Sequence, residues 1–410
     1  MIFAMLLGVL ALWLSLTRVG RQSWSVTLVG VLTIPQRLGS SLVVVIGIAG
    51  VVGVLVAVLA MGAGFEATLR ETGSDDTAIV MRAGAQAELN SVLDHDSATL
   101  IAQMPQIARN ADGQTLASSE LVVVASLPKK STGLDSNVEI RGVGAHGWEL
   151  RPEIHIIAGR RFQPGLRELA VGKGARSQFS HLEVGSNITL NGQAWTVVGA
   201  FESGNAYDSE LWADGDTLGP AYRRGSSSTS VTVRLTSAAA MDAFKAALAS
   251  DPRLKVDART TRAYYTEQSA NLSHFIRLLG LTVGSIMAIG AVFGALNCMY
   301  AAVASRTREI ATLRAIGFRG VPVVISVLIE TMLLALSGGI LGAGIAWLLF
   351  DNYTASTLGS NFSQVVFAFE VTPHLLATGL EWALVIGFVG GLFPALRAAR
   401  LPVTNGLREL

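Results

Sequence analysis

The sequence has little charge and almost no cysteine. Of its 410 residues, 15% are charged and 50% are hydrophobic, the formal net charge is +1, and Cys298 is the single cysteine. Such an apolar composition is unusual for a soluble domain and indicates that part of the chain lies in lipid. One cysteine excludes an intrachain disulfide and any CxxC metal or redox motif. Nucleic acid is excluded as a partner, because phosphate binding needs a concentrated basic face and no Lys/Arg-rich block occurs.

Sequence motifs for catalysis are also lacking. No GxxxxGK[ST] loop occurs, and the segment from Ala170 to Gly174 (AVGKG) is only superficially similar to one. No GxSxG surrounds a serine, and the histidines are scattered without HExxH or another ligand spacing. We therefore expect no catalytic, cofactor-binding or metal site in this chain, and no enzymatic activity of its own.

Charged residues are rare or absent in several long apolar runs of the sequence. A helix needs about 20 apolar residues to cross the hydrocarbon core of a bilayer. Four runs meet this length and are predicted to be transmembrane helices. They cover residues 40–63, 276–304, 321–350 and 375–397.

The N-terminus carries a further, shorter apolar run. Residues 1–17 lack the basic start and the small-residue cleavage site of a signal peptide, so we expect an additional N-terminal transmembrane helix. Residues 18–39, which include Trp24 and Pro35, are expected to form an interfacial elbow.

Arginines of the short connections set the orientation. Residues 305–320 contain Arg306, Arg308, Arg314 and Arg319, and more arginines occur in residues 18–39 and in the tail, 398–410. The positive-inside rule places these segments in the cytoplasm. Residues 64–275 and the loop 351–374 are then extracytoplasmic.

Residues 64–275 have the pattern of a soluble α+β domain. Alternation predicts strands at 77–82, 230–235 and 254–257 and an amphipathic helix at 238–249. These elements form a β-α-β subdomain (64–112 and 225–265) that is split by a mostly β insertion (113–224). The fold class is therefore a polytopic α-helical membrane protein with a large α+β extracytoplasmic domain.

Within the apolar runs, a few small and polar residues stand out. Glu330, Glu381 and Asn297 are costly in lipid and are candidates for function. Glu330 is a ligand for a substrate or proton, or it serves helix packing; Asn297 is expected to bond across a helix interface. Glycines at four-residue spacing let helices approach closely. The pairs are Gly280/Gly284, Gly290/Gly294, Gly338/Gly342 and Gly387/Gly391.

Two motifs carry a resemblance to a known family. Residues 305–317 (SRTREIATLRAIG) contain RxxEIxxLxxxG, and residues 391–402 (GLFPALRAARLP) are similar to GxxPAxRAARxxP with the last proline one residue early. Both resemble motifs of MacB/FtsX-type ABC transporter permeases. In the soluble region, IAGRRF (157–162), LEVGS (182–186) and WTVVG (195–199) are similar to motifs of the MacB-like extracytoplasmic domain. The resemblance covers the chain from about Pro35, whereas residues 1–34 depart from the usual plan.

The resemblance implies a function and partners. A homodimer of permeases in the bacterial inner membrane, with the large domain in the periplasm, would be driven by two copies of a separate ABC ATPase subunit that bind ATP and Mg. The helices would pass ATP-driven motion to the periplasmic domain and so export or extract an envelope substrate. A periplasmic adaptor, an outer-membrane channel and membrane lipid are further expected partners.

The coupling segment would contact the ATPase. Ile310, Leu313 and Ile316 share a stripe at helical spacing. The full set of predicted coupling residues is Arg306, Glu309, Ile310, Leu313, Arg314, Ile316 and Gly317. The alternative is a basic loop with a purely topological role.

Two other functions stay open. One is an FtsX-like signalling permease that regulates a periplasmic partner without transport, although the large bipartite outer domain favours export. The other is a sensor receptor, which would need a cytoplasmic output domain after the last span.

Overall fold

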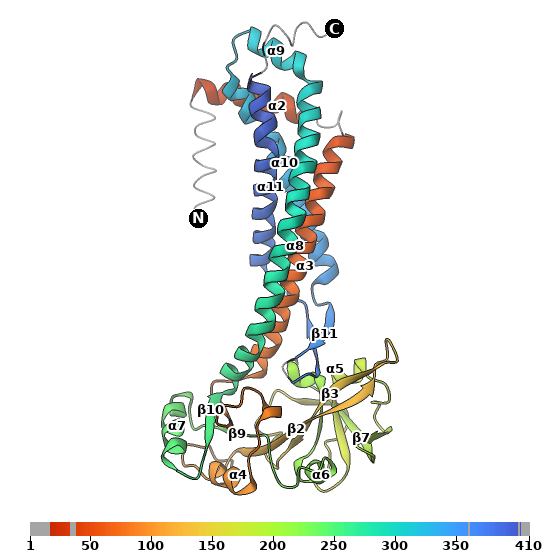
Figure 1. Ribbon diagram of the computed structural model, residues 1–410, viewed down its shortest axis with the longest axis vertical. Coiled ribbons are helices and arrows are strands. Elements are labelled where there is room, and N and C mark those ends of the chain that lie inside the picture. Colours follow the sequence, from red (N-terminus) through yellow and green to blue (C-terminus); the bar gives the residue numbers. More distant parts are fainter. Residues whose placement is uncertain (1–16, 33–37, 360, 401, 403–410) are drawn as a thin grey trace. The chain divides into compact units, whose positions relative to one another are not determined.

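The computed structural model describes residues 17–32, 38–359, 361–400 and 402 (Figure 1). The chain forms two compact units. The membrane unit comprises Met1–Gly62, Phe275–Tyr353 and Glu370–Leu410, and the outer unit comprises Ala63–His274 and Thr354–Phe369. The N-terminal transmembrane helix was predicted at residues 1–17. Residues 1–16 of it lie outside the described residues.

Four helices of the described residues are long and apolar enough to cross a membrane, which confirms the four predicted spans. They are α3 (Leu38–Thr72), α8 (Thr261–Ser305), α10 (Gly320–Phe350) and α11 (Pro373–Arg400). Two of them exceed the prediction, because α3 has 35 residues and α8 has 45. At 1.5 Å per residue they measure roughly 52 and 68 Å, against a hydrocarbon core of about 30 Å. The flanking polar residues contain no proline, so nothing stops the helices where hydrophobicity ends.

Glycines allow the close packing of the membrane helices. A Cβ added at Gly342 of α10 would lie 2.3 Å from the backbone oxygen of Ala49 in α3, and one at Gly387 of α11 would lie 2.4 Å from the Cβ of Ala335. The glycine pairs in α10 and α11, and Gly280/Gly284 in α8, therefore lie at interfaces. Added Cβ atoms at Gly290 and Gly294 would meet nothing within 4 Å among the described residues.

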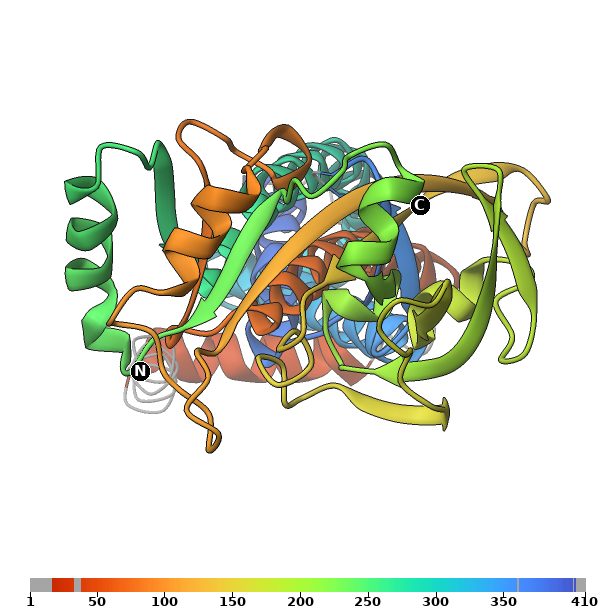
Figure 2. The same cartoon turned by 90° about the horizontal axis from the view of Figure 1, so that it is seen from below.

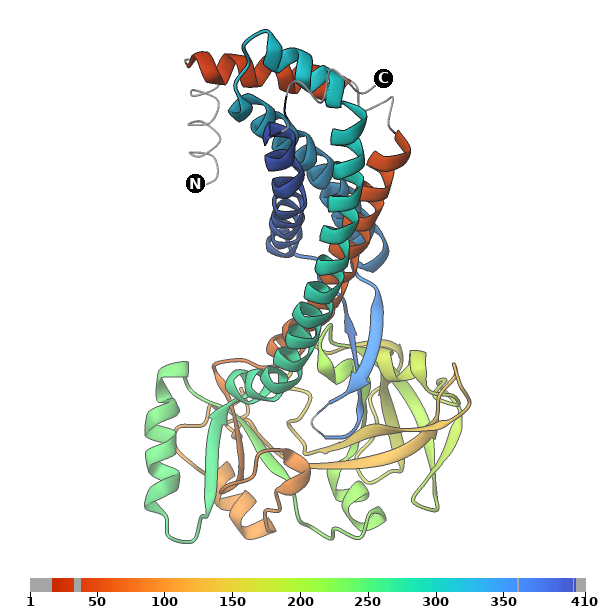
Figure 3. The same ribbon diagram turned by 45° about the horizontal axis from the view of Figure 1, so that its top comes forward.

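Two shorter helices complete the described part of the membrane unit. The elbow segment contains α2 (Arg18–Leu32), which packs against α10, and the predicted coupling segment contains α9 (Thr307–Ala315) (Figure 3).

The outer unit is built on a ten-stranded sheet of the described residues, ordered β10-β1-β9-β2-β3-β8-β5-β7-β4 with β6 beside β7. The strands are β1 (Thr77–Arg82), β2 (Ala117–Pro128), β3 (Asp135–Val143), β4 (His155–Gly159), β5 (Glu168–Gly172), β6 (Asn187–Leu190), β7 (Gln193–Glu202), β8 (Glu210–Asp214), β9 (Ser230–Arg234) and β10 (Val256–Thr260). The strand predicted at 77–82 is confirmed, and the helix predicted at 238–249 is α7 (Met241–Ser250) behind a short turn, η4 (Ala238–Ala240).

The long strand β2 links two hydrophobic cores (Figure 2). Its residues 117–120 pair with β9, and residues 121–128 pair with β3. One core lies among β1, β9, β10, α7 and α4 (His95–Ala102). We call these elements together the split subdomain. The other lies among β3, β5, β7, β8, α5 (Lys173–Gln178) and α6 (Gly215–Ala221), which we call the insertion. The outer unit also contains the two 3-10 turns η2 (Glu88–Asn90) and η3 (Ala206–Ser209).

A small hairpin from another part of the chain joins the outer unit. Strands β11 (Thr354–Leu358) and β12 (Gln364–Ala368) pair in antiparallel fashion within the connection between α10 and α11. The sequence predicted an extracytoplasmic loop at 351–374 but no strands in it.

Candidate functional site

The predicted coupling segment is tied to a transmembrane helix by an ion pair. Arg306, which precedes α9, places Nε 3.0 Å from Oε2 of Glu309 and Nη1 3.2 Å from Oε2 of Glu330 in α10. Glu330 is 3% exposed. Its carboxylate therefore has an arginine partner within the chain, which favours the packing role over a role as a substrate or proton ligand.

The elbow helix covers this ion pair. A Cβ added at Gly30 of α2 would lie 3.3 Å from Oε2 of Glu330 and 3.4 Å from Nη1 of Arg306. Because any side chain here would press on the pair, the small residue allows α2 to close over it. Arg306 and Glu330 thus connect α9, α10 and α2.

The apolar stripe predicted for ATPase docking is divided by the fold. Ile310 is 7% exposed and belongs to a core cluster of α8, α9, α10 and α11 that includes Val303 and Val327. This corrects its predicted place in the docking stripe, because its own chain already covers it. Leu313 is half-buried, and Ile316 is 69% exposed. Sequence periodicity finds the apolar face of a helix but not which part of it the chain itself covers.

Gly317 ends the coupling helix. Its φ is 105°, the N–H of Gly317 donates to the carbonyl of Arg314 (3.2 Å), and the N–H of Phe318 donates to that of Leu313 (3.1 Å). This is a Schellman motif, which favours glycine at the residue with positive φ. The glycine of the family motif therefore fixes where α9 stops and α10 can begin.

The surface around α9 offers both a groove and a charged face. A groove with a volume of about 660 Å³ is lined by residues of α2, α9, α10 and the segments that flank α9, among them Val26, Leu313 and Phe318. Arg308 and Glu309 are exposed beside it, and Arg314 is half-buried.

The other two polar residues of the spans do not join this site. The side chains of Asn297 in α8 and Glu381 in α11 are exposed in the chain. The predicted hydrogen bond of Asn297 across a helix interface is therefore not formed as an interior contact of this chain.

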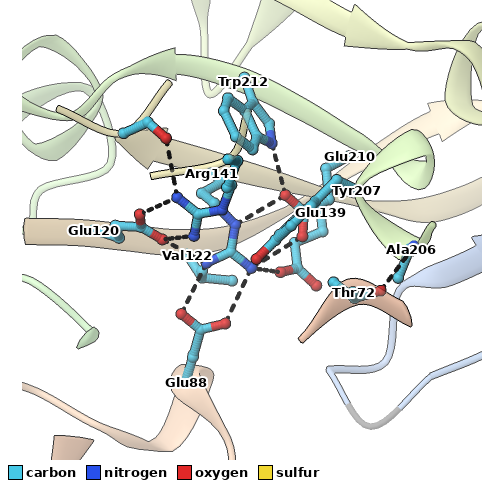
Figure 4. A network of polar contacts seen from close by, with 12 residues as sticks. Thr72, Glu88, Glu120, Val122, Glu139, Arg141, Ala206, Tyr207, Glu210 and Trp212 are labelled. Carbon is cyan, nitrogen blue, oxygen red and sulfur yellow. Dashed lines mark hydrogen bonds and ion pairs between the residues drawn. The ribbon is translucent and has the colours of Figure 1, made fainter. Parts of the chain in front are cut away.

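A second polar cluster, which the sequence did not predict, lies inside the outer unit (Figure 4). Arg141 of β3 is 1% exposed and contacts four carboxylates. It donates to Glu88 (2.8 and 3.0 Å), Glu210 (2.8 and 2.9 Å), Glu120 (3.0 Å) and Glu139 (3.1 Å). Glu139 and Arg141 are two residues apart in a strand and so share a face, which was the one sequence signal for the cluster.

A second arginine completes the charge balance of one carboxylate. Arg151 donates to both oxygens of Glu120, at 2.7 and 2.8 Å, and its guanidinium lies 4.8 Å from the ring centroid of Tyr207 and 5.2 Å from that of Trp212. Such contacts suit a buried site, because the two terminal nitrogens of the guanidinium donate to both carboxylate oxygens while its flat face stacks on aromatic rings.

The carboxylates of the cluster differ in their proton affinity. Burial acts to raise the pKa of Glu120, but the charges of Arg151 and Arg141 and their hydrogen bonds outweigh it, and the pKa is lowered. Burial and the charge of Glu210 raise the pKa of Glu139 to about 8, against the opposing charge of Arg141. Glu139 is therefore expected to bind a proton near neutral pH.

The cluster joins the two subdomains and has no room for a substrate. Glu88 comes from η2 on the split-subdomain side, Glu120 from the junction in β2, and Arg141 and Glu210 from the insertion. The adjoining cavity measures about 30 Å³, far below the roughly 300 Å³ of a ligand pocket. Among the described residues, no group of three His, Cys, Asp or Glu side chains is placed to hold a metal.

Two family models match consecutive parts of the chain. The family model described as MacB-like periplasmic core domain matches residues 41–251, and the model described as FtsX-like permease C-terminal matches residues 281–403.

Curated relatives match shorter stretches. The chain is 35% identical over 116 residues to the macrolide export ATP-binding/permease protein MacB of Pectobacterium atrosepticum, which covers 28% of this chain and 17% of that protein. It is 37% identical over 130 residues to the pyoverdine export ATP-binding/permease protein PvdT of Pseudomonas fluorescens, which covers 31% and 18%. The matched part is thus less than a fifth of each of these two relatives.

Solved structures are similar to part of the chain. The crystal structure of the periplasmic region of MacB from Actinobacillus actinomycetemcomitans covers 46% of this chain and 90% of its own, with 14% identity and a TM-score of 0.36.

The ion pair at α9 can be tested by a double-mutant cycle. We expect Arg306→Met alone to destabilise the protein by about 3–5 kcal/mol, because the buried carboxylate of Glu330 loses its arginine. Glu330→Met alone should cost less, because Arg306 is partly exposed and keeps its ion pair with Glu309. The double variant should lose much less, since it buries no charge. Thermal unfolding of the purified protein in detergent measures all four proteins. Additive losses in the double variant would contradict a direct pair.

The proton affinity of Glu139 predicts a pH dependence of stability. Its pKa is about 8 in the folded protein against an ordinary value of 4.5, so the folded state binds the proton more tightly. The stability it contributes is fully present below pH 4.5 and is lost as the pH rises toward about 8, by about 1.4 kcal/mol per pH unit. Glu139→Gln, which stays neutral, should lack this loss and exceed the wild type in unfolding temperature at alkaline pH. Identical pH profiles for the two proteins would show that Glu139 does not titrate in this range.

Proposed function

The chain belongs to the family of ABC transporter permeases with a MacB-like periplasmic core domain and an FtsX-like C-terminal region, and we propose that it couples ATP hydrolysis by a separate subunit to movements of its outer domain. It is a multi-pass membrane protein of an ATP-driven complex. The proposed result of these movements is the export or extraction of an envelope substrate.

The observation that carries the proposal is the construction of α9. This nine-residue helix lies between two spans, is fixed to α10 by Arg306 and Glu330, and is ended by Gly317. Its opposite face exposes Ile316 together with Arg308 and Glu309. A helix that is held to α10 on one side and exposed on the other can transmit the movement of a bound partner to the transmembrane helices.

Export is favoured over signalling by two observations. The outer unit has two subdomains around separate cores, which gives it parts that can move against each other. The names of the relatives MacB and PvdT describe export of a macrolide and of pyoverdine. An FtsX-like signalling permease is the alternative, and the substrate of an exporter would be an envelope molecule.

The proposed assembly follows from the family and the exposed helix surfaces. Two ATPase copies, a second permease copy, a periplasmic adaptor and an outer-membrane channel are the proposed partners. The apolar window of α8 is only 17% buried in the chain, which supports a surface for lipid or for the second copy. The bacterial inner membrane is the proposed location, with the outer unit in the periplasm.

ATPase docking predicts a difference between two exposed positions of α9. Burying an apolar side chain in a partner groove contributes about 1.5–3 kcal/mol, whereas an exposed charge contributes under about 1 kcal/mol. Ile316→Asp should therefore weaken ATPase binding by roughly ten-fold or more, and Arg308→Ala by much less. Leu313→Asp should act in the same direction as Ile316→Asp, because Leu313 lines the neighbouring groove. The readouts are co-purification of the ATPase subunit and ATP turnover, which we expect to be absent with the permease alone.

The control for this experiment is protein stability, because Ile316 is exposed and its replacement should leave the unfolding temperature unchanged. An Ile316→Asp protein that retains its ATPase subunit at the wild-type ratio would remove α9 from the docking surface.

The proposed orientation predicts which cysteines a reagent can reach from outside. In a Cys298→Ser background, Ser226→Cys in the outer unit should react with a membrane-impermeant maleimide in cells with a permeabilised outer membrane. Thr312→Cys in α9 should react after lysis of the inner membrane. Both positions are exposed in the chain, so burial does not explain a difference. Labelling of Thr312→Cys before lysis would reverse the topology.

A further inference from the structure

The β11–β12 hairpin connects two spans to the insertion, whereas the chain enters the outer unit from the other two spans at the split subdomain. These other two helices also touch η3 of the insertion, because the N–H of Ala206 donates to Oγ1 of Thr72 in α3 at 3.0 Å and the hydroxyl of Tyr265 in α8 donates to that of Tyr207 at 3.2 Å. Along the chain, α3 leads to β1 and α8 follows β10, and these two strands pair in the split subdomain. The spans α10 and α11 are joined through the hairpin, which belongs to the outer unit.

The hairpin is bound mainly to the insertion (Figure 3). The backbone N–H of Val366 donates to Oγ of Ser209 in η3 at 2.8 Å. Nδ2 of Asn137 in β3 donates to the carbonyl of Phe362 at 3.0 Å, and Nζ of Lys129 donates to Oε1 of Gln364 at 3.1 Å. Near its base, Phe367 meets Phe65 of α3 with ring centroids 5.5 Å apart.

The most deeply buried contacts are made on one carboxyl group. Nδ2 of Asn361 and Oγ of Ser363 donate to Oε2 of Glu139, at 3.0 and 3.1 Å. Asn361 is 7% exposed and Ser363 is 2% exposed. The other oxygen of Glu139 accepts from Arg141. Separating such buried partners leaves polar groups without hydrogen bonds, which is costly away from water.

We propose that the β11–β12 hairpin is a grip by which α10 and α11 hold the insertion, fastened by Asn361 and Ser363 on Glu139. The inference rests on the proposed function, because it names the part of the outer unit on which these two spans act. The pair α3 and α8 then acts on the split subdomain and on η3, and the pair α10 and α11 acts on the insertion through β3. A difference in movement between the pairs becomes a change in the angle between the subdomains.

The position of Glu139 explains why it is the anchor. It lies on β3 beside Arg141, so a pull on its carboxyl group acts directly on the cluster that joins the insertion to β2 and η2. The residues of the hairpin carry no charge. The charged or titratable groups that face Glu139 come from β3 (Arg141), β8 (Glu210), η2 (Glu88) and α8 (Tyr264 and Tyr265). The grip therefore adds hydrogen bonds to the cluster without changing its charge.

The attachment itself is tested by cross-linking in membranes without any ATPase. In a Cys298→Ser background, Lys129→Cys and Gln364→Cys should be joined by a short bifunctional maleimide, because the native side chains meet end to end. The matched control is Lys130→Cys with Gln364→Cys, since Lys130 is exposed and contacts Arg176 and Glu183 instead. We expect at least a ten-fold higher cross-linked fraction in the first pair. Equal fractions would overturn the attachment.

The action of the grip is tested in the full complex with its ATPase subunit. Spin labels on Thr189→Cys in the insertion and Lys245→Cys in the split subdomain, both exposed sites, report the distance between the subdomains. With ATP and vanadate, this distance should change. The change should fall by at least half in Asn361→Ala/Ser363→Ala, and it should persist in Glu139→Gln, which can keep hydrogen bonds to both residues.

A control variant and a second readout separate a failure of the grip hypothesis from a failure of the proposed function. Thr354→Ala/Thr357→Ala alters the same hairpin away from Glu139 and should behave as the wild type. ATPase co-purification and ATP turnover should be unchanged in the grip variant, because α9 is intact; their absence in the wild type would count against the proposed function instead. An unchanged distance response after Asn361→Ala/Ser363→Ala, or no response in the wild type, would overturn the grip.

Discussion

The outer unit depends on one buried guanidinium. Arg141 contacts four glutamates, which come from η2, β2, β3 and β8, and each of them is at most 7% exposed. Without a central positive charge these carboxylates would repel each other in a medium of low polarity, and burying an unpaired charge costs several kcal/mol. Five donors in a rigid fork let one arginine serve four partners, which a lysine with its three rotating donors would not reproduce. The two subdomains are therefore held together at their junction by charge as well as by strand pairing.

The same constraint shapes the other end of the chain. Glu330 lies in an apolar helix, and its carboxylate is accommodated because Arg306 reaches back from the start of α9. The ion pair thereby gives α9 a defined position on α10, and Gly30 leaves the space that the pair needs. In both units a residue type that is costly to bury marks the point where separate elements are held together.

The sequence predicted features that depend on local pattern and missed those that depend on distant partners. Hydropathy located the four spans, and alternation located β1. Alternation did not find β8, because the strand Glu210–Asp214 begins and ends with an acidic residue. These two side chains are buried because Glu210 pairs with Arg141 and Asp214 caps α6 by accepting from the N–H of Thr217. Periodicity placed Ile310 on the apolar face of α9 but could not show that α8, α10 and α11 cover it. The grip was beyond prediction, since Asn361 and Glu139 are 222 residues apart.

Under the proposed function, the junction in β2 would transmit force between the subdomains, and its composition suits that role. Residues 117–120 bond to β9 and residues 121–128 bond to β3, so the backbone hydrogen bonds continue through the point where the neighbouring strand changes. A strand can twist and bend there at little cost while each ladder stays paired. Neutral hydrogen bonds weaken steeply when their geometry is disturbed, whereas the attraction between charges falls only with the inverse of distance. Glu120, held by Arg141 and Arg151 at the last residue paired with β9, places such a tolerant contact at the bend itself. A junction of this kind lets the subdomains turn against each other while the sheet between them stays intact.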